Sequence, residues 1–321
     1  MIILKKILEK FTGWHYPQEY LCLAREQYTQ PLQACLVRRG KVAADITGCH
    51  LFVGYSPLVV ALPSAVTQDA LIDVYFFQHP QPLNANAAPG RAVACLRAEQ
   101  VHAQQADGAG IIYYRGLKCR HRMLSQPQQW IVGLQNSLFN NKGGNVYLPH
   151  GLYKQVQVAY ALPRTVSLIT VGGEGGYNLF PTDLHGPAGA NHYLISLRTT
   201  GKALTQVLAA GRLLLSEVEA RCYRAVYSLG KNHMQPLKER AAFPFCGEES
   251  LHFNLPLPKG AVRYRELQLE DLWSEGIHTI LLMKVEGKSV LTEGVPTLAH
   301  VHNSYATWRY KQGLESNYLL R

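Results

Sequence analysis

The stretch "YNLFPTDLHGPAGANHYLISLRTTGKALTQVLAAGRLLLSEV", Tyr177–Val218, carries the most informative order of elements in this chain. It predicts an apolar strand that ends at Arg198, a short amphipathic helix that begins after Gly201, and a second apolar strand. A Pro/Gly-bounded loop that contains Thr, Asp and His precedes the first strand. A buried strand that ends in a hydroxyl and a guanidinium, directly before a helix, indicates a ligand site as well as a fold.

Polar groups gather at this predicted strand–helix junction. Hydroxyl, guanidinium and ammonium groups would meet the free amides of a helix N-terminus there, and such groups bind phosphate. The alternative is that the hydroxyls cap the helix and the arginine is solvated, and the residue types leave both interpretations open. The residues concerned are Ser196, Arg198, Thr199, Thr200 and Lys202.

Strand patterns dominate on both sides of this stretch. They are rich in Val, Ile, Leu and Phe and bounded by Gly or Pro, whereas helical patterns occur only at intervals, as in 125–138 and 219–229. This does not match the even alternation of a doubly wound sheet, so we predict a mainly β fold with interspersed helices, of the β-barrel or α+β type. The predicted strand regions outside the opening stretch are 34–55, 57–63, 71–77, 92–101, 165–171, 251–257, 261–269 and 277–287.

The Gly/Asn-rich run "NNKGGNVYLPHG", Asn140–Gly151, is the best candidate for a boundary within the chain. It separates a β-rich N-terminal region, 1–150, from a second domain, 151–321. The apolar start "MIILKKILEKFTGW" is too short and too interrupted for a signal peptide or a membrane span. We interpret it as a short helix that docks on the body of the protein.

Composition limits the class of protein. In 321 residues, 47% are apolar and 17% are charged, which is typical of a folded globular protein. The net charge of +10 favours an anionic partner, but the basic residues are scattered and no nucleic-acid-binding motif occurs. The seven cysteines never form Cys-x-x-Cys, so we expect reduced thiols, a cytoplasmic protein, and neither a nucleic-acid nor a membrane partner.

Several short motifs can be set aside. "GGEGGYN" has Asn178 at the third glycine position of a dinucleotide fingerprint, and it predicts a hairpin turn instead. "VEGKSV" lacks the upstream glycine of a P-loop, and "GYSPL" lacks the second glycine of a nucleophile elbow. His300 and His302 could begin a metal site, but no third ligand is evident, and we predict none. The basic cluster "KCRHR", Lys118–Arg122, is interpreted as a solvated face.

The order of the remaining motifs resembles the flavin reductase-like, FMN-binding split-barrel family. In that family a strand and hairpin lead into an Asn-x-x-x-x-Thr/Ser-like loop. A strand that ends in a Ser-Leu-Arg-type sequence follows, and then a helix, a strand and a second helix. The matching runs here are "VSLITV", "GGYNLFPTDLHGPAG" and "HYLISLRTTGKALTQVLAAGRLLLSEV", while "EGIHTILLMKV" matches the family's Gly-x-His-Thr and apolar strand. The resemblance covers Ala161–Glu286 and implies an FMN-binding split barrel in the C-terminal half.

The same resemblance implies roles for individual residues. Asn178, Thr182 and Asp183 would lie along the flavin edge, and the residues of the strand–helix junction would hold the FMN phosphate. His278 would lie near the flavin ring or the nicotinamide as the catalytic residue, because imidazole can donate a hydrogen bond or a proton near neutral pH. Without the family pattern, a histidine that fixes a barrel corner explains the same position.

Two departures from the family pattern matter. The loop "PTDLHGPAGANHY" is longer and more charged than usual, which concerns the substrate side of the site. The first 150 residues lie outside the usual minimal module. They are either unrelated to it or a divergent second split barrel, since "GKVAADITGCHLFVGYSPLVVAL" repeats its rhythm of hairpin, aromatic loop and apolar strand. In the family the flavin lies between two barrels, so the first case implies a homodimer, which we expect, and the second allows a monomer.

Three functions compete at this point. The leading hypothesis is an FMN-dependent oxidoreductase of the flavin reductase type, with FAD as the alternative flavin and NADH or NADPH as the electron donor. The second is a non-catalytic flavin- or haem-binding protein on the same scaffold, since a fold does not determine a function. The third, an anion-binding module without a cofactor, rests on the basic charge alone.

Overall fold

The first half of the chain forms a seven-stranded antiparallel sheet in the computed structural model, which describes residues 7, 10–106, 108–139, 151–173, 175–314 and 316–319. The strand order is β3-β2-β6-β7-β8-β5-β4. The strands are β2 (Gln33–Arg38), β3 (Lys41–Asp45), β4 (Leu51–Tyr55), β5 (Leu58–Pro63), β6 (Leu71–Phe77), β7 (Ala94–Ala106) and β8 (Ala109–His121).

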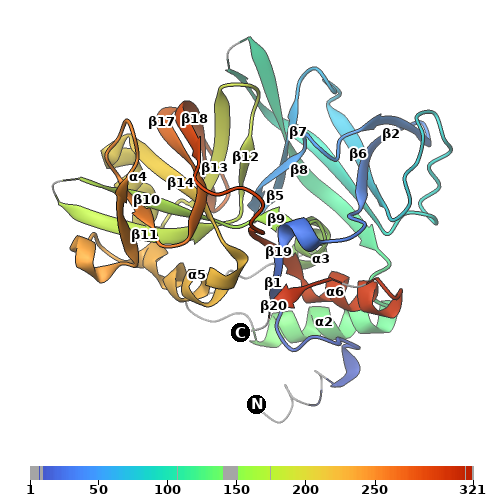
Figure 1. Cartoon of the computed structure of the whole chain (residues 1–321). Coiled ribbons are helices and arrows are strands. Elements are labelled where there is room, and N and C mark those ends of the chain that lie inside the picture. The colour runs from blue at the N-terminus through green and yellow to red at the C-terminus, as the bar shows by residue number, and fades with distance from the viewer. Residues whose placement is uncertain are drawn as a thin grey trace.

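The second half forms another seven-stranded antiparallel sheet, in the order β11-β10-β14-β17-β18-β13-β12. Figure 1 shows the two sheets side by side, with the second sheet on the left. Its strands are β10 (Ser167–Gly173), β11 (Gly176–Thr182), β12 (His185–Pro187), β13 (His192–Arg198), β14 (Arg212–Val218), β17 (Ala261–Glu275) and β18 (His278–Val290).

The two sheets have the same topology. When the strands of each sheet are numbered from one to seven along the chain, both sheets read 2-1-5-6-7-4-3. One difference concerns the link that follows the fourth strand. In the second sheet this link contains α4 (Lys202–Ala210), whereas in the first sheet residues 64–70 contain no helix. A strand–helix junction after the fourth strand is therefore a property of the second sheet.

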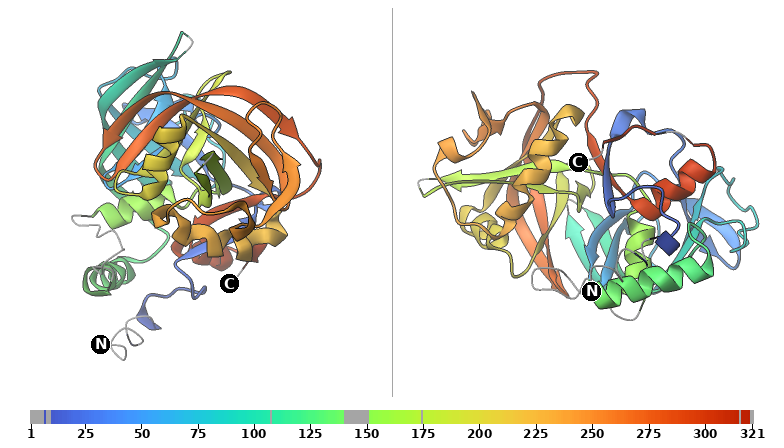
Figure 2. Two further views of the ribbon diagram at one scale, coloured as in Figure 1. Left: turned by 90° about the vertical axis from the view of Figure 1, so that its left-hand side faces the viewer. Right: turned by 90° about the horizontal axis from the view of Figure 1, so that it is seen from below.

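A third, four-stranded sheet joins distant parts of the chain, in the order β20-β1-β19-β9. It combines β1 (Tyr20–Ala24), which precedes the first large sheet, with β9 (Arg164–Thr165) between the two large sheets. The strands β19 (Leu298–His302) and β20 (Tyr318–Leu319) come from the end of the chain. The helices α2 (Gln126–Phe139) and α6 (Asn303–Lys311) lie on the same side of the molecule in the views of Figure 1 and Figure 2.

Smaller elements complete the fold. The helix α3 (Leu152–Ala159) packs on β7 and β8 of the first sheet, although it follows the predicted boundary in the chain. The helix α5 (Tyr223–Leu229) packs on β11. The remaining elements are β15 (Phe245–Glu249), β16 (Pro256–Pro258), and the short 3-10 helices η1 (Arg25–Gln27), η2 (Ala220–Cys222), η3 (Gly230–Met234) and η4 (Arg240–Ala242).

The two large sheets pack directly against each other. Val59 and Tyr113 of the first sheet share one apolar cluster with Leu194 and Ile280 of the second, and all four are buried. At the tip of β17 and β18, Gly276 has φ +57°, and a Cβ atom there would lie 2.1 Å from the backbone oxygen of Ser56. The sheets therefore meet with backbone in contact, and a glycine is required at this point.

The predicted fold class is confirmed, since the described residues are mainly β with interspersed helices. One detail differs. The run 251–257 is a turn with only the short β16 at its end, because Glu266 holds its backbone amides in place of a sheet partner. The cluster Lys118–Arg122 lies at the end of β8, where Lys118, Arg120 and Arg122 are exposed, as a solvated face requires, and His121 is buried. The boundary at Asn140–Gly151 lies outside the described residues apart from Gly151, so the division into 1–150 and 151–321 stays a prediction.

Candidate functional site

The strand–helix junction lies where β13 meets α4. β13 pairs with β18 so that Arg198 stands opposite His278 and Ser196 opposite Ile280. The Ser196 side chain is buried, and its Oγ lies 3.0 Å from Nδ1 of His278. Sheet register thus brings together two residues that are 82 positions apart in the chain.

Positive charge at the junction has no acidic partner. Nε of Arg198 donates to the hydroxyl of Tyr55 at 3.0 Å, and no ion pair of Arg198 or of the exposed Lys202 occurs among the described residues. Gly201, the N-cap of α4, supplies no side-chain cap to the first amides of the helix. An anion placed here would therefore meet unneutralised cations and free helix amides.

The hydroxyls of the junction differ in their surroundings. Thr199 Oγ1 lies 3.1 Å from Oγ1 of Thr279, and the Thr199 amide donates to the carbonyl of Ile277 at 2.9 Å. Thr200 is exposed at the turn. Thr199 thus fixes the turn to β18, while Thr200 and Lys202 are accessible to a ligand.

His278 is buried beside the junction. Burial, and after it the charge of Arg198, lowers the pKa of His278 to about 4. Its ring lies edge-on to Tyr55 at 4.5 Å between centroids, and its Nε2 has no hydrogen-bond partner among the described residues. His278 is therefore neutral at pH 7, and it can exchange a hydrogen bond with a ligand but holds no proton to release as an acid.

Asn178 and Thr182, which the family pattern places along the flavin edge, are both buried on β11. The amide of Asn178 donates to Gln206 Oε1 at 2.7 Å and to the carbonyl of Asn232 at 3.0 Å. Its Oδ1 accepts from the amide of Leu179 at 2.8 Å. The Asn178 amide therefore fixes β11 to α4 and η3, and its role toward a flavin stays a prediction.

Asp183 is the centre of a buried ion cluster. Its Oδ2 lies 2.6 Å from NH2 of Arg164 and 3.1 Å from Nδ1 of His300. Burial alone would raise the pKa of Asp183, but Arg164 and His300 outweigh it and hold this pKa well below its usual range. Burial would likewise lower the pKa of His300, yet the hydrogen bond that His300 donates to Asp183 raises it to about 9. Asp183 thus joins β9, β19 and the loop before β12, on the third and second sheets.

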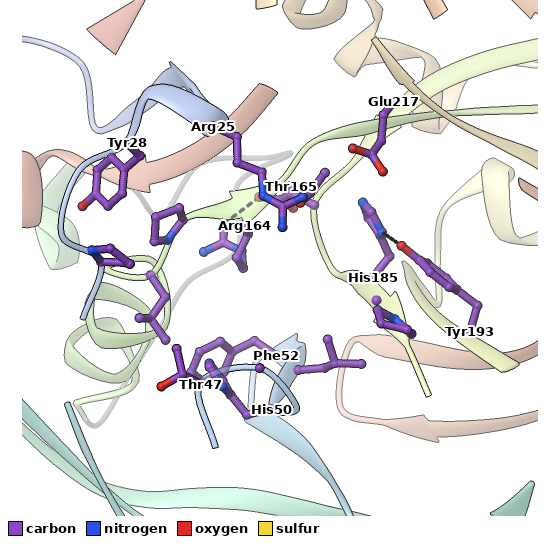
Figure 3. A pocket seen from close by; sticks show the side chains of 18 of the residues that line it. Arg25, Tyr28, Thr47, His50, Phe52, Arg164, Thr165, His185, Tyr193 and Glu217 are labelled. Atoms are coloured by element: carbon purple, nitrogen blue, oxygen red, sulfur yellow. Dashed lines mark hydrogen bonds and ion pairs between the residues drawn. The ribbon is translucent and has the colours of Figure 1, made fainter. Parts of the chain in front are cut away.

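A pocket of about 600 Å³ opens next to this ion cluster, between all three sheets. Figure 3 shows Arg25 and Arg164 on one side of it, His50 and Phe52 on another, and His185 with Tyr193 on a third. Nδ1 of His185 lies 2.9 Å from the hydroxyl of Tyr193. Such a volume is within the usual range for small-molecule sites.

No group of three or more potential metal ligands occurs among the residues that the structure describes. The two histidines of "AHVHNSY" have other partners. His300 belongs to the Asp183 cluster, and Nδ1 of His302 accepts from the amide of Ser304 at 3.1 Å as the N-cap of α6. In the described part of the chain, no helix is of a length and apolarity that would suit a membrane crossing.

Sequence reasoning missed Tyr55 and the arginines of the pocket. Tyr55 lies in "GYSPL", whose Ser-Pro turn indicates a hairpin but not its contact with the second sheet. Arg263 and Arg265 share the strand β17, but Arg25 follows β1 at the other end of the chain. No local pattern could have joined Arg25 to the other two, because β1 and β17 belong to different sheets.

Comparison with known proteins gives matches to solved structures only. No model of a protein family matches this chain, and no curated protein matches it. An FMN-binding protein from Thermus thermophilus, with bound p-hydroxybenzaldehyde, is 20% identical over 40% of this chain and 73% of its own, with a TM-score of 0.36. The NADH:FAD oxidoreductase SgcE6 of Streptomyces globisporus is 18% identical over 51% of this chain and 96% of its own, with a TM-score of 0.43.

A third match is the flavin reductase PheA2, which is 17% identical over 46% of this chain and 92% of its own, with a TM-score of 0.39. These proteins are of the kind that the sequence resembles. The likeness concerns about half of this chain and its fold alone. The chemistry below is therefore argued from the residues of this chain.

Proposed function

We propose that this protein binds a flavin nucleotide, FMN in preference to FAD, with its phosphate at the β13–α4 junction. The observation that supports this most directly is the unneutralised pair of cations, Arg198 and Lys202, at the uncapped N-terminus of α4. A phosphate would accept hydrogen bonds from the guanidinium, the helix amides and the exposed hydroxyl of Thr200. The resemblance of the sequence to FMN-binding split barrels predicts the same positions.

The buried His278 fits a bound ring system near this phosphate site. Its Nε2 has no hydrogen bond among the described residues, and a buried polar atom without a hydrogen bond is unfavourable. A flavin edge or a nicotinamide amide would supply the missing hydrogen bond. Because His278 is neutral, we assign it to orientation of the bound ring and not to acid catalysis.

On this basis the protein is an oxidoreductase of the flavin reductase type, with NADH or NADPH as the electron donor. The flavin supplies the hydride chemistry, while the chain binds and orients it. Tyr55 and Arg198 hold the two large sheets together at the site, so both halves of the chain contribute to it.

A second candidate is a non-catalytic flavin-binding protein. The low pKa of His278 favours it, because a neutral imidazole has no proton to give to a reduced flavin. The two candidates differ in one measurable property, since only the oxidoreductase accelerates flavin reduction by a nicotinamide nucleotide.

The test is a titration with FMN and with riboflavin, followed by flavin fluorescence. Arg198→Ala removes a charge-assisted contact of about 1.5–3 kcal/mol, so FMN affinity should fall about tenfold to a hundredfold. Riboflavin, which has no phosphate, should bind wild type and variant equally. Arg212→Ala, at the opposite end of α4, is the matched control and should leave FMN binding unchanged. Equal FMN affinity of Arg198→Ala and wild type would refute the phosphate site.

Anaerobic mixing of the FMN-loaded protein with NADH or NADPH then separates the two candidates. Bleaching of the flavin band faster than for free FMN supports the oxidoreductase. Bleaching at the rate of free FMN, with FMN still bound, supports the binding protein.

A further inference from the structure

The pocket between the three sheets is separate from the β13–α4 junction. Its lining contains Asp183 and His185 but no residue of 196–202 or 276–279. Between them runs the backbone of Leu184, whose carbonyl accepts a hydrogen bond from the amide of Ser196 at 2.9 Å. The segment from Asp183 to β12 therefore separates the pocket from the junction, and a ligand in one site does not occupy the other.

The pocket has an excess of positive charge. Four arginines line it, Arg25, Arg164, Arg263 and Arg265, against two carboxylates, Asp183 and Glu217. Asp183 is bound to Arg164, while Glu217 lies 3.4 Å from Arg265 and 3.9 Å from Arg263. Glu26, 3.9 Å from Arg263, adds a negative charge at the rim.

Arg25 is the arginine whose charge has no counterpart. It follows β1 directly, and Figure 3 shows its guanidinium extending into the pocket near Thr165. It forms no ion pair among the residues that the structure describes. Arg263 and Arg265 are about two-thirds covered, with 34% and 30% of their side chains exposed, so both can reach a ligand.

One buried donor in the wall lacks a partner. Nε of Arg164 has no hydrogen bond within the described part of the chain, and Arg164 is more than nine-tenths buried. Nε of Arg263 and Oε2 of Glu217 have no hydrogen bond either, but they lie 3.9 Å apart as an ion pair. Buried polar atoms are normally satisfied, so the Arg164 donor fits a polar occupant of the pocket.

Part of the remaining wall is aromatic. Tyr28, Phe52 and Tyr193 line the pocket together with His50 and His185. Burial lowers the pKa of His50, and burial lowers the pKa of His185 to about 4 against the opposing charge of Asp183, with a smaller contribution from Arg265. Both rings are therefore neutral at pH 7. These walls suit a planar ring, and the arginines suit a group with two negative charges.

We infer that this pocket is a second ligand site, which binds an organic phosphate of nucleotide size with the phosphate at Arg25, Arg263 and Arg265. A phosphate monoester carries about −1.5 to −2 charges at pH 7, which matches the excess of two arginines over carboxylates in the lining better than a single carboxylate does. The attached ring lies against the aromatic wall. This inference does not depend on flavin binding at the junction.

The experiment is isothermal titration calorimetry of the full chain with three probes: AMP, adenosine and inorganic phosphate. AMP should bind, whereas adenosine, which lacks the phosphate, and inorganic phosphate, which lacks the ring, should each bind at least tenfold more weakly. Adenosine as tight as AMP would overturn the phosphate assignment. Phosphate as tight as AMP would overturn the nucleotide class.

Variants locate the binding. Arg25→Ala should weaken AMP binding at least fivefold, and Arg25→Lys should keep part of the affinity because it keeps the charge. Arg120→Ala, which removes an exposed arginine of β8 outside the pocket, should have no effect. Equal AMP affinity of Arg25→Ala and wild type would overturn the inference.

Arg198→Ala distinguishes this site from the flavin site. It should leave AMP binding unchanged, whatever its effect on FMN. Loss of AMP binding in Arg198→Ala would place AMP at the junction and overturn the inference, while the result with FMN would still decide the proposed function separately.

Discussion

The hydroxyl of Tyr55 accepts a hydrogen bond from Nε of Arg198 at 3.0 Å, across 143 positions of the chain. Tyr55 ends β4 of the first sheet, and Arg198 ends β13 of the second. The bond holds the guanidinium at the junction and leaves its two terminal nitrogens for a ligand. The first half of the chain is thus part of the candidate flavin site, although the sequence resemblance covers only the second half.

Gly276→Ala should disturb the packing between the large sheets. A Cβ atom would lie 2.1 Å from the backbone oxygen of Ser56. The same oxygen accepts a hydrogen bond from the amide of Ile277 at 3.1 Å. We expect a loss of about 1–3 kcal/mol in unfolding free energy from this clash, in addition to about 1 kcal/mol for the left-handed backbone. Urea unfolding followed by tryptophan fluorescence measures it.

Gly294→Ala is the control for this measurement. Gly294 also has a positive φ, +70°, but no atom lies within 4 Å of its Cβ position. It should lose only the conformational part, about 1 kcal/mol. If both variants lose the same free energy, the sheets do not pack at Gly276 as the structure has them.

Asp183→Asn should destabilise the protein more than it weakens FMN binding. The substitution leaves Arg164 and the charged His300 without their shared carboxylate, and unpaired buried charges cost about 3–5 kcal/mol. Chemical denaturation at pH 7 measures the loss. Glu249→Gln is the control, because its ion pair with Arg240 is 40% exposed on both sides and should contribute less than about 1 kcal/mol.

The same variant tests the sequence-based role of Asp183 at the flavin edge. A folded Asp183→Asn protein that loses FMN affinity as strongly as Arg198→Ala would favour that role. The pKa of His300, measured by NMR, should fall from about 9 in the variant. A His300 pKa that stays high would show that other groups hold its proton.

The sequence predicted those parts of the molecule whose information is local. The strand that ends at Arg198, the helix α4 after Gly201 and the hairpin at Gly172–Gly176 follow from apolar periodicity and glycine positions within a few residues. The meeting of Ser196 with His278 is different, because it depends on the register of β13 with β18. The family resemblance, not residue spacing, placed both at one site.

Longer-range features were beyond the sequence. The run "AGIIYYRGLKCRH" is the strand β8, which was not predicted. Its basic end was interpreted only as a solvated face, and Arg120 is indeed exposed, but Tyr113 and Tyr114 of the same strand are buried. The third sheet assembles β1, β9, β19 and β20 from distant segments, and the Arg25 pocket depends on it. Pairing between such short strands has no sequence pattern of its own.

The stability of the protein should fall between pH 6.5 and pH 4, in part because of His278. Burial, followed by Arg198, lowers its folded pKa to about 4, whereas an unfolded histidine titrates near 6.5. The unfolded chain therefore binds the proton first as pH falls. The contribution of His278 is full above about pH 6.5 and is lost toward pH 4, by up to about 3 kcal/mol.

His278→Gln isolates this contribution, because glutamine can still bond to Ser196 but does not titrate. Its stability curve should be flatter than that of wild type across this range. Burial also lowers the pKa values of His121 and His185 to about 4. The stability of both proteins should therefore still depend on pH to some extent. Parallel curves for the two proteins would show that His278 titrates normally.

The last prediction concerns the mass of the protein in solution. From the sequence we expect a homodimer, which follows if the first half is unrelated to the barrel, whereas a second copy of the barrel in that half allows a monomer. Both halves have the same strand order, and β4 of the first sheet contacts β12, β13 and β18, the counterparts of β4, β5 and β8. In a two-fold homodimer, each subunit would contribute the same strands to the interface. Here the two halves of one chain contribute corresponding strands, so this interface already forms within a single chain. We therefore expect light scattering at micromolar concentration to give a mass near 35.8 kDa, and one FMN per chain at saturation. A mass near twice that value would show that the protein is a homodimer. In that case Gly276→Ala, which disturbs a contact within one chain, should not change the mass.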